Sequence, residues 1–387
     1  MTLRAILVCE AWGRREEMFQ HALVGASGRE LARMLAEAGL APELEMKYPN
    51  ELDMIAFWRR LKENHGIAVA NVFNMRPPDN NLQYFYGNDN WRNACPMPRY
   101  KASKVSGWIK PEYFDHIEQL WKFISDSKPN LVIAFGNCSC WALLGQTKIT
   151  ELRGSVQISE RLGLKVLPTF HPANLLYPGG WMNRPVLVAD LKKAAREIEF
   201  PELRRIKRWI TTHDFRTGTR LTLAEIRQWF NRPATKYAID IESGYALYDR
   251  TELKRMTPQM RYILSSLISM VGFARSPDDI ISIPFMDRNL PGLNYWPDPN
   301  DEVEAWKLTL RGLKRPVEKV FQNGLYDISR FLSMGIMPTM CYRDTMLRHH
   351  ALYPEQLKSL GFQGSLYSDE VSWKLMYKNK DSLKRDE

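Results

Sequence analysis

The 387-residue chain has few cysteines and no long hydrophobic run, and both features exclude classes of protein. Its five cysteines are scattered along the chain without a Cys-x-x-Cys pattern. This spacing argues against a disulfide framework and against a zinc site, and it favours reduced thiols in a cytoplasm. The apolar runs fall well below the roughly 18 residues that a membrane span needs, and the N-terminal segment is too short for a signal peptide. We therefore expect a cytoplasmic protein with no membrane partner.

The chain does have an excess of positive charge. It contains 54 Lys and Arg against 44 Asp and Glu, which gives a formal net charge of +10. Such an excess attracts polyanions, so nucleic acid is a candidate partner. Many basic proteins bind no nucleic acid, and the charge by itself leaves that alternative open.

The order of apolar segments predicts two α/β domains joined by a basic linker. In residues 1–198 we expect strands at 3–9, 68–73, 131–135 and 164–170, with amphipathic helices at 28–39 and ending near 198. Residues 199–233 interleave Arg and Lys with Trp and Phe, typical of a solvated linker or of a segment that follows a phosphate backbone. In residues 234–387 we expect strands at 236–242, 264–273, 280–285 and 319–321 and a helix at 301–313.

Four separated motifs lie in the first domain in a fixed order. They occupy residues 9–13 with 22–28, residues 71–78, residues 129–136 with 143–145, and residues 153–154 with 169–176. Their order and spacing resemble the uracil-DNA glycosylase superfamily, most closely its thermophilic-type iron-sulfur branch, over about the first 195 residues. The resemblance implies an α/β/α sandwich with a parallel sheet.

The resemblance also assigns roles to residues of these motifs. Base excision requires that the base is flipped out of the stack, read on its Watson-Crick edge and stabilised as an anion. Asn71 matches the base-reading residue, and His171 matches the donor to the departing base. Glu10 and Glu16 match acidic positions that orient water or stabilise the cationic sugar. Leu23 and Arg76 complete the expected substrate-binding residues of this domain.

Several residues depart from the family pattern. Cys9 and Trp12 stand where the family has glycine and proline, and Leu23 replaces the aromatic residue that stacks on the flipped base. The cysteines that bind the family's cluster are missing, with Met75 at one ligand position and Cys95 as a single relic, so we expect no iron-sulfur cluster. The domain is then either an active glycosylase or a catalytically silent module that binds DNA or uracil.

A second set of acidic residues lies in the second domain. Asp240 and Glu242 alternate on a predicted strand, which places both carboxylates on one face. Asn323 and Asp327 follow in an Asn-x-x-x-Asp motif, and Asp344 begins a predicted helix that it is expected to cap. The set resembles the DEDD-type 3′-5′ exonuclease of family-A DNA polymerases, which implies a ribonuclease-H-like mixed sheet.

The exonuclease resemblance implies a two-metal site for Mg²⁺ or Mn²⁺. It assigns Asp240, Glu242 and Asp327 to the metal ions and Asn323 to substrate positioning. The family's last motif, Tyr-x-x-x-Asp, has a literal match at residues 377–381 in a Lys-rich tail. We expect instead that this domain is C-terminally incomplete and that a polymerase-domain polypeptide supplies the missing motif.

Together these expectations describe the N-terminal fragment or subunit of a phage-type family-A DNA polymerase in a bacterium or phage-infected cell. Its substrate would be single-stranded DNA or a primer 3′ end, with proofreading hydrolysis in the second domain and a glycosylase-like first domain. Two alternatives stay open. One is a non-catalytic DNA- or uracil-binding subunit of a polymerase, and the other is a protein in which only the glycosylase is active.

Overall fold

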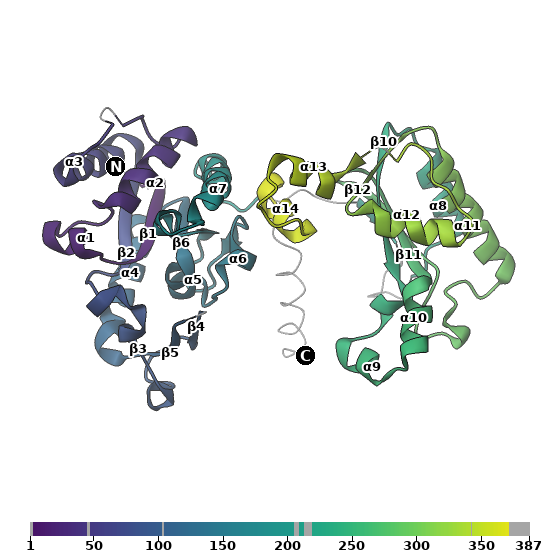
Figure 1. The fold of residues 1–387 in the computed structure, drawn as a ribbon, viewed down its shortest axis with the longest axis horizontal. Coiled ribbons are helices and arrows are strands. Elements are labelled where there is room, and N and C mark those ends of the chain that lie inside the picture. The colour runs from purple at the N-terminus through teal and green to yellow at the C-terminus, as the bar shows by residue number, and fades with distance from the viewer. Residues whose placement is uncertain are drawn as a thin grey trace. The chain divides into compact units, whose positions relative to one another are not determined.

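The chain divides into two units, which Figure 1 shows as a ribbon. Unit 1 consists of Met1–Arg205 and Glu355–Glu387, and unit 2 is Ile206–Pro354. The computed structural model describes residues 3–44, 47–102, 104–204, 209–212, 219–341 and 343–370. This division differs from the predicted bounds at 198 and 233, because part of the predicted linker belongs to unit 2 and the segment after Pro354 belongs to unit 1.

Unit 1 is built on a five-stranded sheet in the order β2-β1-β6-β8-β7. The first four strands in this order are parallel, and β7 pairs with β8 in the antiparallel sense. The strands are β1 (Ala5–Ala11), β2 (Ile67–Phe73), β6 (Leu131–Phe135), β7 (Gln157–Ile158) and β8 (Lys165–Thr169). The predicted strands near 3–9, 68–73, 131–135 and 164–170 are therefore confirmed.

Helices cover both faces of this sheet because its strands are apolar on both sides. On β1, Ile6 and Val8 pack into one core, whereas Leu7 and Cys9 pack into the other. The first core includes side chains of α4 (Phe114–Ser127) and α5 (Gly136–Leu144). The second includes side chains of α2 (Ala26–Glu37), α3 (Glu51–His65) and α7 (Arg184–Glu197). This three-layer arrangement places the loops after β1, β2 and β8 at one edge of the sheet.

A long excursion between β2 and α4 is attached to the first core by aromatic rings. It contains a small sheet of β3 (Tyr86–Gly87), β4 (Tyr100–Lys101) and β5 (Ser106–Ile109). Phe73 stacks on Phe85 with ring centroids 3.8 Å apart, and Tyr86 stacks on Tyr100 at 4.5 Å. Met75, which stands at the position of one cluster ligand of the family, packs against the same core, and Cys95, the one cysteine that could remain of the ligand set, packs in it.

Unit 2 contains a six-stranded mixed sheet in the order β14-β13-β10-β11-β12-β9. Strands β10, β11 and β12 are antiparallel neighbours, while β13 and β14 run parallel to β10. Strand β9 pairs parallel with β12. The strands are β9 (Trp209–Thr211), β10 (Lys236–Ser243), β11 (Ile268–Ser276), β12 (Asp279–Pro284), β13 (Glu318–Phe321) and β14 (Arg343–Asp344).

One face of the unit 2 sheet is buried by α8 (Leu223–Asn231) and α11 (Pro299–Lys314). Along β10 burial alternates, so that Tyr237, Ile239 and Ile241 enter this core and the intervening residues face the other way. The remaining helices of the unit are α9 (Arg250–Arg255), α10 (Pro258–Ser266), α12 (Gly324–Ser333) and α13 (Thr345–Leu352). The α/β class predicted for the chain is thus confirmed.

Two sequence predictions in unit 2 need correction. Residues 264–266 form the end of helix α10 and not the start of a strand, because Thr257 caps the helix and Pro258 occupies its first turn. The predicted linker 199–233 contains strand β9 and helix α8, whose Trp229 and Phe230 are buried in the unit 2 core. The basic residues Arg205, Lys207, Arg208 and Arg216 of that segment lie outside the described residues.

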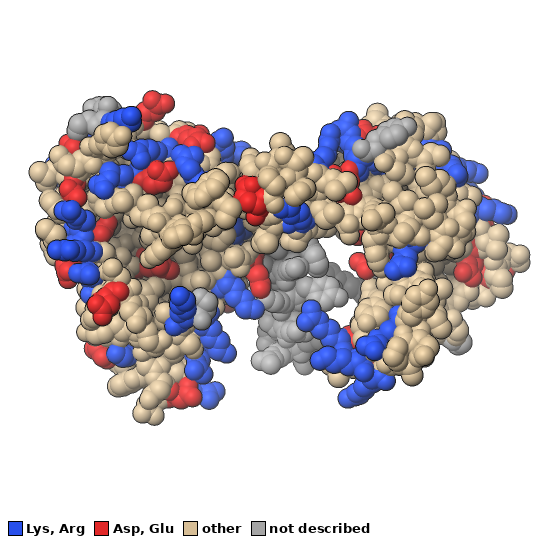
Figure 2. Space-filling model, viewed as in Figure 1, with Lys and Arg blue, Asp and Glu red and all other residues tan. Residues whose placement is uncertain are grey.

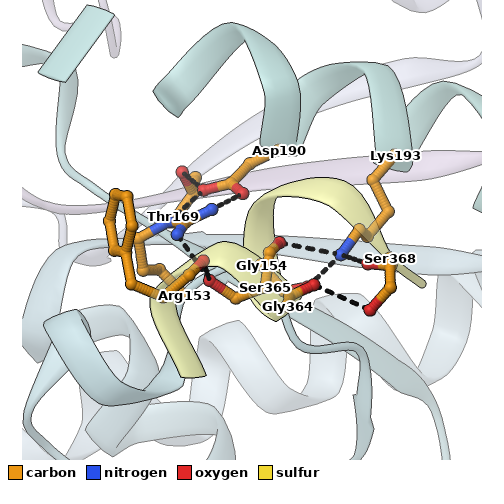
Figure 3. A network of polar contacts seen from close by, with 9 residues as sticks. Arg153, Gly154, Thr169, Asp190, Lys193, Gly364, Ser365 and Ser368 are labelled. Carbon is orange, nitrogen blue, oxygen red and sulfur yellow. Dashed lines mark hydrogen bonds and ion pairs between the residues drawn. The ribbon is translucent and has the colours of Figure 1, made fainter. Parts of the chain in front are cut away.

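Helix α14 (Leu360–Tyr367), near the C-terminus, is attached to unit 1 by a buried polar network (Figure 3). The Arg153 guanidinium forms an ion pair with Asp190 of α7, with its Nε 2.9 Å from Asp190 Oδ2. The hydroxyl of Thr169 donates to the same carboxylate at 2.7 Å. A third bond runs from Arg153 Nη1 to Ser365 Oγ of α14 at 2.8 Å.

The ammonium of Lys193 adds a second buried cation to this network (Figure 3). It donates to the carbonyl oxygens of Ser365 at 3.1 Å and Ser368 at 2.7 Å, and also to the carbonyl oxygen of Gly154. Arg153 and Lys193 expose only 1% and 2% of their surface. Because a buried cation is costly without acceptors, the C-terminal segment is a structural part of unit 1.

The surface of each unit mixes both signs of charge. Figure 2 shows Lys and Arg interspersed with Asp and Glu on the visible face of each unit. Within the described part of the chain, no helix is both long and apolar enough to cross a membrane.

Candidate active site

A pocket of about 390 Å³ lies in unit 1 at the edge where the loops after β1, β2 and β8 meet. Parallel strands end together at such an edge, so residues distant in sequence converge there. The pocket is lined by Cys9, Glu10, Ala11, Trp12, Gly13, Glu16, Leu23, Ser27, Asn71, Pro77, Asn80, Leu82, His171, Ala173, Asn174 and Tyr177. The structure thus brings together five residues that the sequence predicted for the first site.

Glu10 lies next to the last residue of β1 and points toward helix α5. Its Oε1 accepts a hydrogen bond from the backbone N–H of Cys138 at 3.1 Å, in the first turn of that helix. Gly136 leaves room for the carboxylate, since a Cβ at this position would lie 2.5 Å from Glu10 Oε1. The helix N-terminus and its free N–H groups therefore fix a negative charge at the wall of the pocket.

Glu16 reaches the pocket from helix α1 (Arg14–Phe19). Its Oε1 accepts from the backbone N–H of Gly25 at 3.0 Å, immediately before helix α2. Its other oxygen lies close to Gly13, where a Cβ would approach it to 2.7 Å. The two pocket carboxylates are thus each fixed by a backbone donor at the start of a different helix.

Asn71 lies near the carboxyl end of β2 and exposes only 4% of its surface. In the amide orientation that satisfies both partners, its Oδ1 accepts from the indole N–H of Trp12 at 3.0 Å and its Nδ2 donates to the carbonyl of Ala70 at 3.2 Å. Trp12 is tied to the same loop through its backbone, which donates to the carbonyl of Met75 at 3.2 Å.

His171 follows β8 and begins the short 3₁₀ helix Pro172–Leu176. Its Nδ1 accepts a hydrogen bond from the backbone N–H of Ala173 at 3.2 Å. Burial lowers the pKa of His171, and the negative charges of Glu10 and Glu16 oppose this effect without reversing it. A neutral ring whose Nδ1 is an acceptor carries its proton on Nε2, so His171 has a hydrogen-bond donor available beyond its own backbone contact.

Leu23 has a left-handed backbone (φ 60°) and is buried at the pocket wall. Its carbonyl accepts from the indole N–H of Trp58 at 2.9 Å. Arg76 does not line the pocket. It pairs with Glu17 at 3.6 Å and donates to Asn80 Oδ1 at 2.9 Å, and Asn80 does line the pocket.

Sequence reasoning missed the two aromatic residues of this pocket. Trp12 entered only as a departure from the family pattern, yet its indole contacts Asn71. Tyr177 lines the pocket and exposes 69% of its surface, so its ring is accessible to a ligand that enters from solvent. Tyr177 lies seven residues before Arg184, the first residue of α7, in a loop that contains Pro and Gly. The Pro and Gly residues predicted the loop, but nothing in the sequence predicted that the ring lies at the pocket.

In unit 2 the predicted carboxylates lie on and beside β10. Asp240 and Glu242 share the solvent-accessible face of the strand. Asp327 of α12 is buried, and its Oδ1 accepts from the backbone N–H of Ile241 at 3.1 Å. Burial, together with the negative charge of Asp240, raises the pKa of Asp327 to about 7. Desolvation also raises the pKa of Asp240, and desolvation together with the charge of Asp240 raises that of Glu242.

Asp344 caps helix α13, as predicted. Its carboxylate accepts from the backbone N–H groups of Met346 at 2.8 Å and Leu347 at 3.1 Å. The same carboxylate accepts from Gly324 at 2.7 Å, which ties the start of α12 to the start of α13. Asn323, in a left-handed conformation (φ 59°), is the residue that precedes α12.

Among the described residues, no three His, Cys, Asp or Glu side chains converge as a group that could hold a metal ion. Asp240 and Asp327 are electrostatically coupled, while Glu242 is coupled to Asp240. Residues 377–381, the alternative source of a fourth carboxylate, lie outside the described residues.

Comparison with known proteins gives two matches. Residues 2–193 match the family model of the uracil DNA glycosylase superfamily. The chain is also similar to a type-4 uracil-DNA glycosylase of Archaeoglobus fulgidus, with 25% identity over 179 residues. That alignment covers 44% of this chain and 66% of the archaeal protein, so just under two thirds of that relative is matched. The family-model match covers the part of the chain that forms the pocket.

Proposed function

Because residues 2–193 form a domain of the uracil DNA glycosylase superfamily, we propose that unit 1 removes uracil from DNA. The observation that carries the proposal is the meeting of Asn71 and His171 in one pocket, with the ring proton of His171 on Nε2. Asn71 reads the flipped base through its amide. His171 donates from Nε2 to the carbonyl oxygen on which negative charge develops as the glycosidic bond breaks.

The two glutamates act on the sugar side of the reaction. The departing base leaves a sugar with positive character, which a nearby carboxylate stabilises. Glu10 and Glu16 are each fixed by a backbone donor, so their charges are preorganised at the pocket wall. One of them also orients the water that completes hydrolysis. These roles follow the superfamily resemblance, and the geometry of both side chains supports them.

Uracil release from a single-stranded, uracil-containing oligonucleotide tests this proposal. We expect Asn71→Ala and His171→Ala each to lower the rate on the order of 10²-fold, the usual cost of losing one donor to a developing anion. His65→Ala, at the end of α3 and outside the pocket, is the matched control and should release uracil at the parental rate. Release that is unaffected by both pocket substitutions would contradict the site. Tight binding of uracil-containing DNA without release would favour the non-catalytic alternative.

For unit 2 we propose a 3′-5′ exonuclease that acts on single-stranded DNA or a primer 3′ end. Three observations support it: the mixed sheet with β13 and β14 parallel to β10, the paired carboxylates of β10, and the buried Asp327 beside them. Burial, together with the negative charge of Asp240, raises the pKa of Asp327 to about 7, and strongly shifted carboxyls of this kind are common at functional sites.

The residue types of the proposed unit 2 site suit a hard divalent cation, although among the described residues their side chains do not converge as a group of three that could hold one. Asp240, Asp327 and Glu242 supply only carboxylate oxygens, which Mg²⁺ and Mn²⁺ prefer. Desolvation raises the pKa of all three carboxyls, and the charge of Asp240 adds to the rise at Glu242 and Asp327; a bound cation would relieve this electrostatic cost. A bound ion would support water activation and leaving-group stabilisation in phosphodiester hydrolysis. Asn323, at the start of α12, is the proposed substrate-positioning residue.

The test is shortening of a 3′-labelled oligonucleotide with Mg²⁺ or Mn²⁺, comparing the parental chain with Asp240→Ala. Metal-dependent shortening that disappears in the variant would support a complete site in this chain. Intact ends in both proteins would favour a site that a separate polypeptide must complete. The association with a family-A polymerase, a phage origin and a polymerase-domain partner are proposals that rest on the sequence resemblance.

A further inference from the structure

Trp12 occupies one side of the amide that reads the base in the proposed function. Its indole N–H lies 3.0 Å from Asn71 Oδ1, and the backbone bond from Trp12 to Met75 holds the loops after β1 and β2 together at this point. Trp12 also lines the pocket. The contact is therefore part of the proposed base-reading site and not of the core behind it.

The hydrogen bonds of Asn71 fix which amide atom is which. A primary amide offers two acceptor positions on oxygen and two donor positions on nitrogen. The indole N–H of Trp12 can only donate and the carbonyl oxygen of Ala70 can only accept, so each of them pairs with the Asn71 amide in one orientation only. Rotation of the amide by 180° would set an N–H against the indole N–H and an oxygen against the Ala70 carbonyl. Both contacts would be repulsive, and water could not relieve them, because Asn71 exposes only 4% of its surface.

After these two bonds the amide has one acceptor position and one donor position left for a ligand. Uracil presents a carbonyl acceptor and an imide N–H donor on the edge that is read. Cytosine presents an amino donor and a ring-nitrogen acceptor in the same places, which would require the opposite amide orientation. The choice between the two bases therefore depends on what prevents the amide from turning.

We infer that Trp12 is a specificity-determining residue, which locks the Asn71 amide in the orientation that pairs with uracil and rejects cytosine. This inference rests on the proposed function of unit 1. It assigns a positioning role to a residue that departs from the family pattern. The Ala70 carbonyl contributes to the same lock, so loss of the indole N–H relaxes the discrimination without abolishing it.

The test is Trp12→Phe, which keeps an aromatic ring and removes the N–H. We measure single-turnover release of uracil and of cytosine from otherwise identical single-stranded oligonucleotides. The ratio of the two rates should fall about tenfold in Trp12→Phe, the effect of one hydrogen bond. Trp121→Phe is the matched control, because it removes an indole N–H bond to Ala142 between α4 and α5 and should leave the ratio unchanged. A merely structural effect of Trp12 would lower both rates together, and an unchanged ratio would overturn the inference.

A binding measurement separates this inference from the proposed function. Oligonucleotides with 2′-fluoro-2′-deoxyuridine or 2′-fluoro-2′-deoxycytidine resist cleavage of the glycosidic bond, so their affinities report base reading alone. Preferential binding of the uracil analogue that is reduced in Trp12→Phe supports the lock even if no base is released. Equal affinity of the parental chain for both analogues overturns the lock, whether or not uracil is released.

Discussion

His171 shows how a single hydrogen bond and partial burial together set the chemistry of a side chain. The backbone N–H of Ala173 occupies Nδ1, and burial lowers the pKa of the ring. Both effects favour the neutral form with its proton on Nε2. A hydrogen-bond donor is thus present in the pocket without a net positive charge on the ring beside Glu10 and Glu16.

The first prediction concerns the pH dependence of uracil release. Because the pKa of His171 in the folded protein lies below the ordinary value of about 6.5, we expect the rate to decline on acidification from about pH 8 with a midpoint below about pH 6.5. The unfolded chain binds this proton more readily, so the contribution of His171 to stability also falls as pH drops below about 6.5. Single-turnover rates across this range are the measurement. A decline centred at or above pH 6.5 would contradict the lowered pKa.

The second prediction concerns Asp327. Asparagine can still accept from the Ile241 N–H but carries no buried charge, so Asp327→Asn should raise the free energy of unfolding of unit 2 by about 2 kcal/mol at pH 8. The pKa of Asp327 is about 7 in the folded protein and about 3.9 in the unfolded chain. The free-energy cost of burying the ionised carboxylate therefore grows as pH rises from about 4 to about 7. Thermal unfolding at pH 5 and pH 8 tests this.

Two outcomes distinguish the reasons for keeping an acidic residue at this position. The gain in stability should shrink to roughly a third at pH 5 and vanish below about pH 4, because the unfolded carboxyl, with a pKa of about 3.9, must also be protonated before the penalty is gone. Any metal-dependent nuclease activity should be lost in the same variant, since the amide is a poorer ligand. A variant that is less stable at pH 8 would show that the ionised carboxylate stabilises the fold.

The sequence predicted much of the first site at this scale, but not its details. Glu10 and Asn71 lie near the carboxyl ends of parallel strands and His171 follows another, and such strands bring their ends together. The Trp12–Asn71 bond could not be predicted, because it joins two different loops whose conformations depend on tertiary contacts. The sequence showed that Leu23 replaces the aromatic residue that stacks on the base. It did not show that the Tyr177 ring lines the same pocket.

At the scale of elements, helix α5 is the part of unit 1 on which the first site depends most directly. Its first turn donates to Glu10, and Gly136 at its start has a left-handed backbone with φ 86°. A side chain there would meet both Glu10 and His171, with His171 Cβ at 3.2 Å. The close approach of strand, helix and loop thus requires glycine at this one position.

The third prediction is that Gly136→Ala lowers the stability of unit 1 by about 3 kcal/mol and strongly reduces uracil release. The left-handed backbone costs a non-glycine residue roughly 1–2 kcal/mol, and displacement of Glu10 adds to this cost. Gly163→Ala is the matched control, since its φ is 64° but no atom lies within 4 Å of the added Cβ. It should show the backbone cost alone and normal release. Equal effects of the two substitutions would exclude a contact between residue 136 and Glu10.

The predicted elements were accurate where the hydrophobic pattern extended over many residues and had a clear period. The strands of the unit 1 sheet and helix α11 agree with expectation, because apolar runs and an amphipathic pattern determine them locally. Helix α8 was missed within a segment interpreted as a linker, although Thr222 and Glu225 form a capping box that the sequence displays. Strand β9 spans three residues, and only its pairing with β12 defines it.

At the scale of the whole molecule, the chain leaves unit 1 after Arg205, forms unit 2 and returns to unit 1 at Glu355. Sequence reasoning could not find this return, because the contacts of α14 are made by serine hydroxyl and carbonyl groups that carry no periodic signal. Since two units are present, unfolding of the chain need not follow a single transition, and each unit requires its own probe.

The last prediction is that removal of the residues after Pro354 destabilises unit 1 and spares unit 2. Arg153 loses its bond to Ser365 Oγ, and Lys193 loses two of its carbonyl acceptors, those of Ser365 and Ser368. Each of these three hydrogen bonds contributes about 1 kcal/mol net, so we expect a loss of about 3 kcal/mol in unit 1. Hydrogen exchange of β6 and β10 reports the two units separately.

Two controls make this test specific to the network in Figure 3. Removal of residues 371–387 alone keeps the three bonds from Arg153 and Lys193 to Ser365 and Ser368, and it should leave exchange in β6 unchanged. Ser365→Ala removes the acceptor of Arg153 together with the bond from the Ser365 hydroxyl to the Phe362 carbonyl within α14. It should reproduce about a third of the loss, because the carbonyl contacts to Lys193 remain. Faster exchange in β10 but not in β6 after truncation at Pro354 would assign the C-terminal segment to unit 2, as the sequence had suggested, and would contradict its place in unit 1.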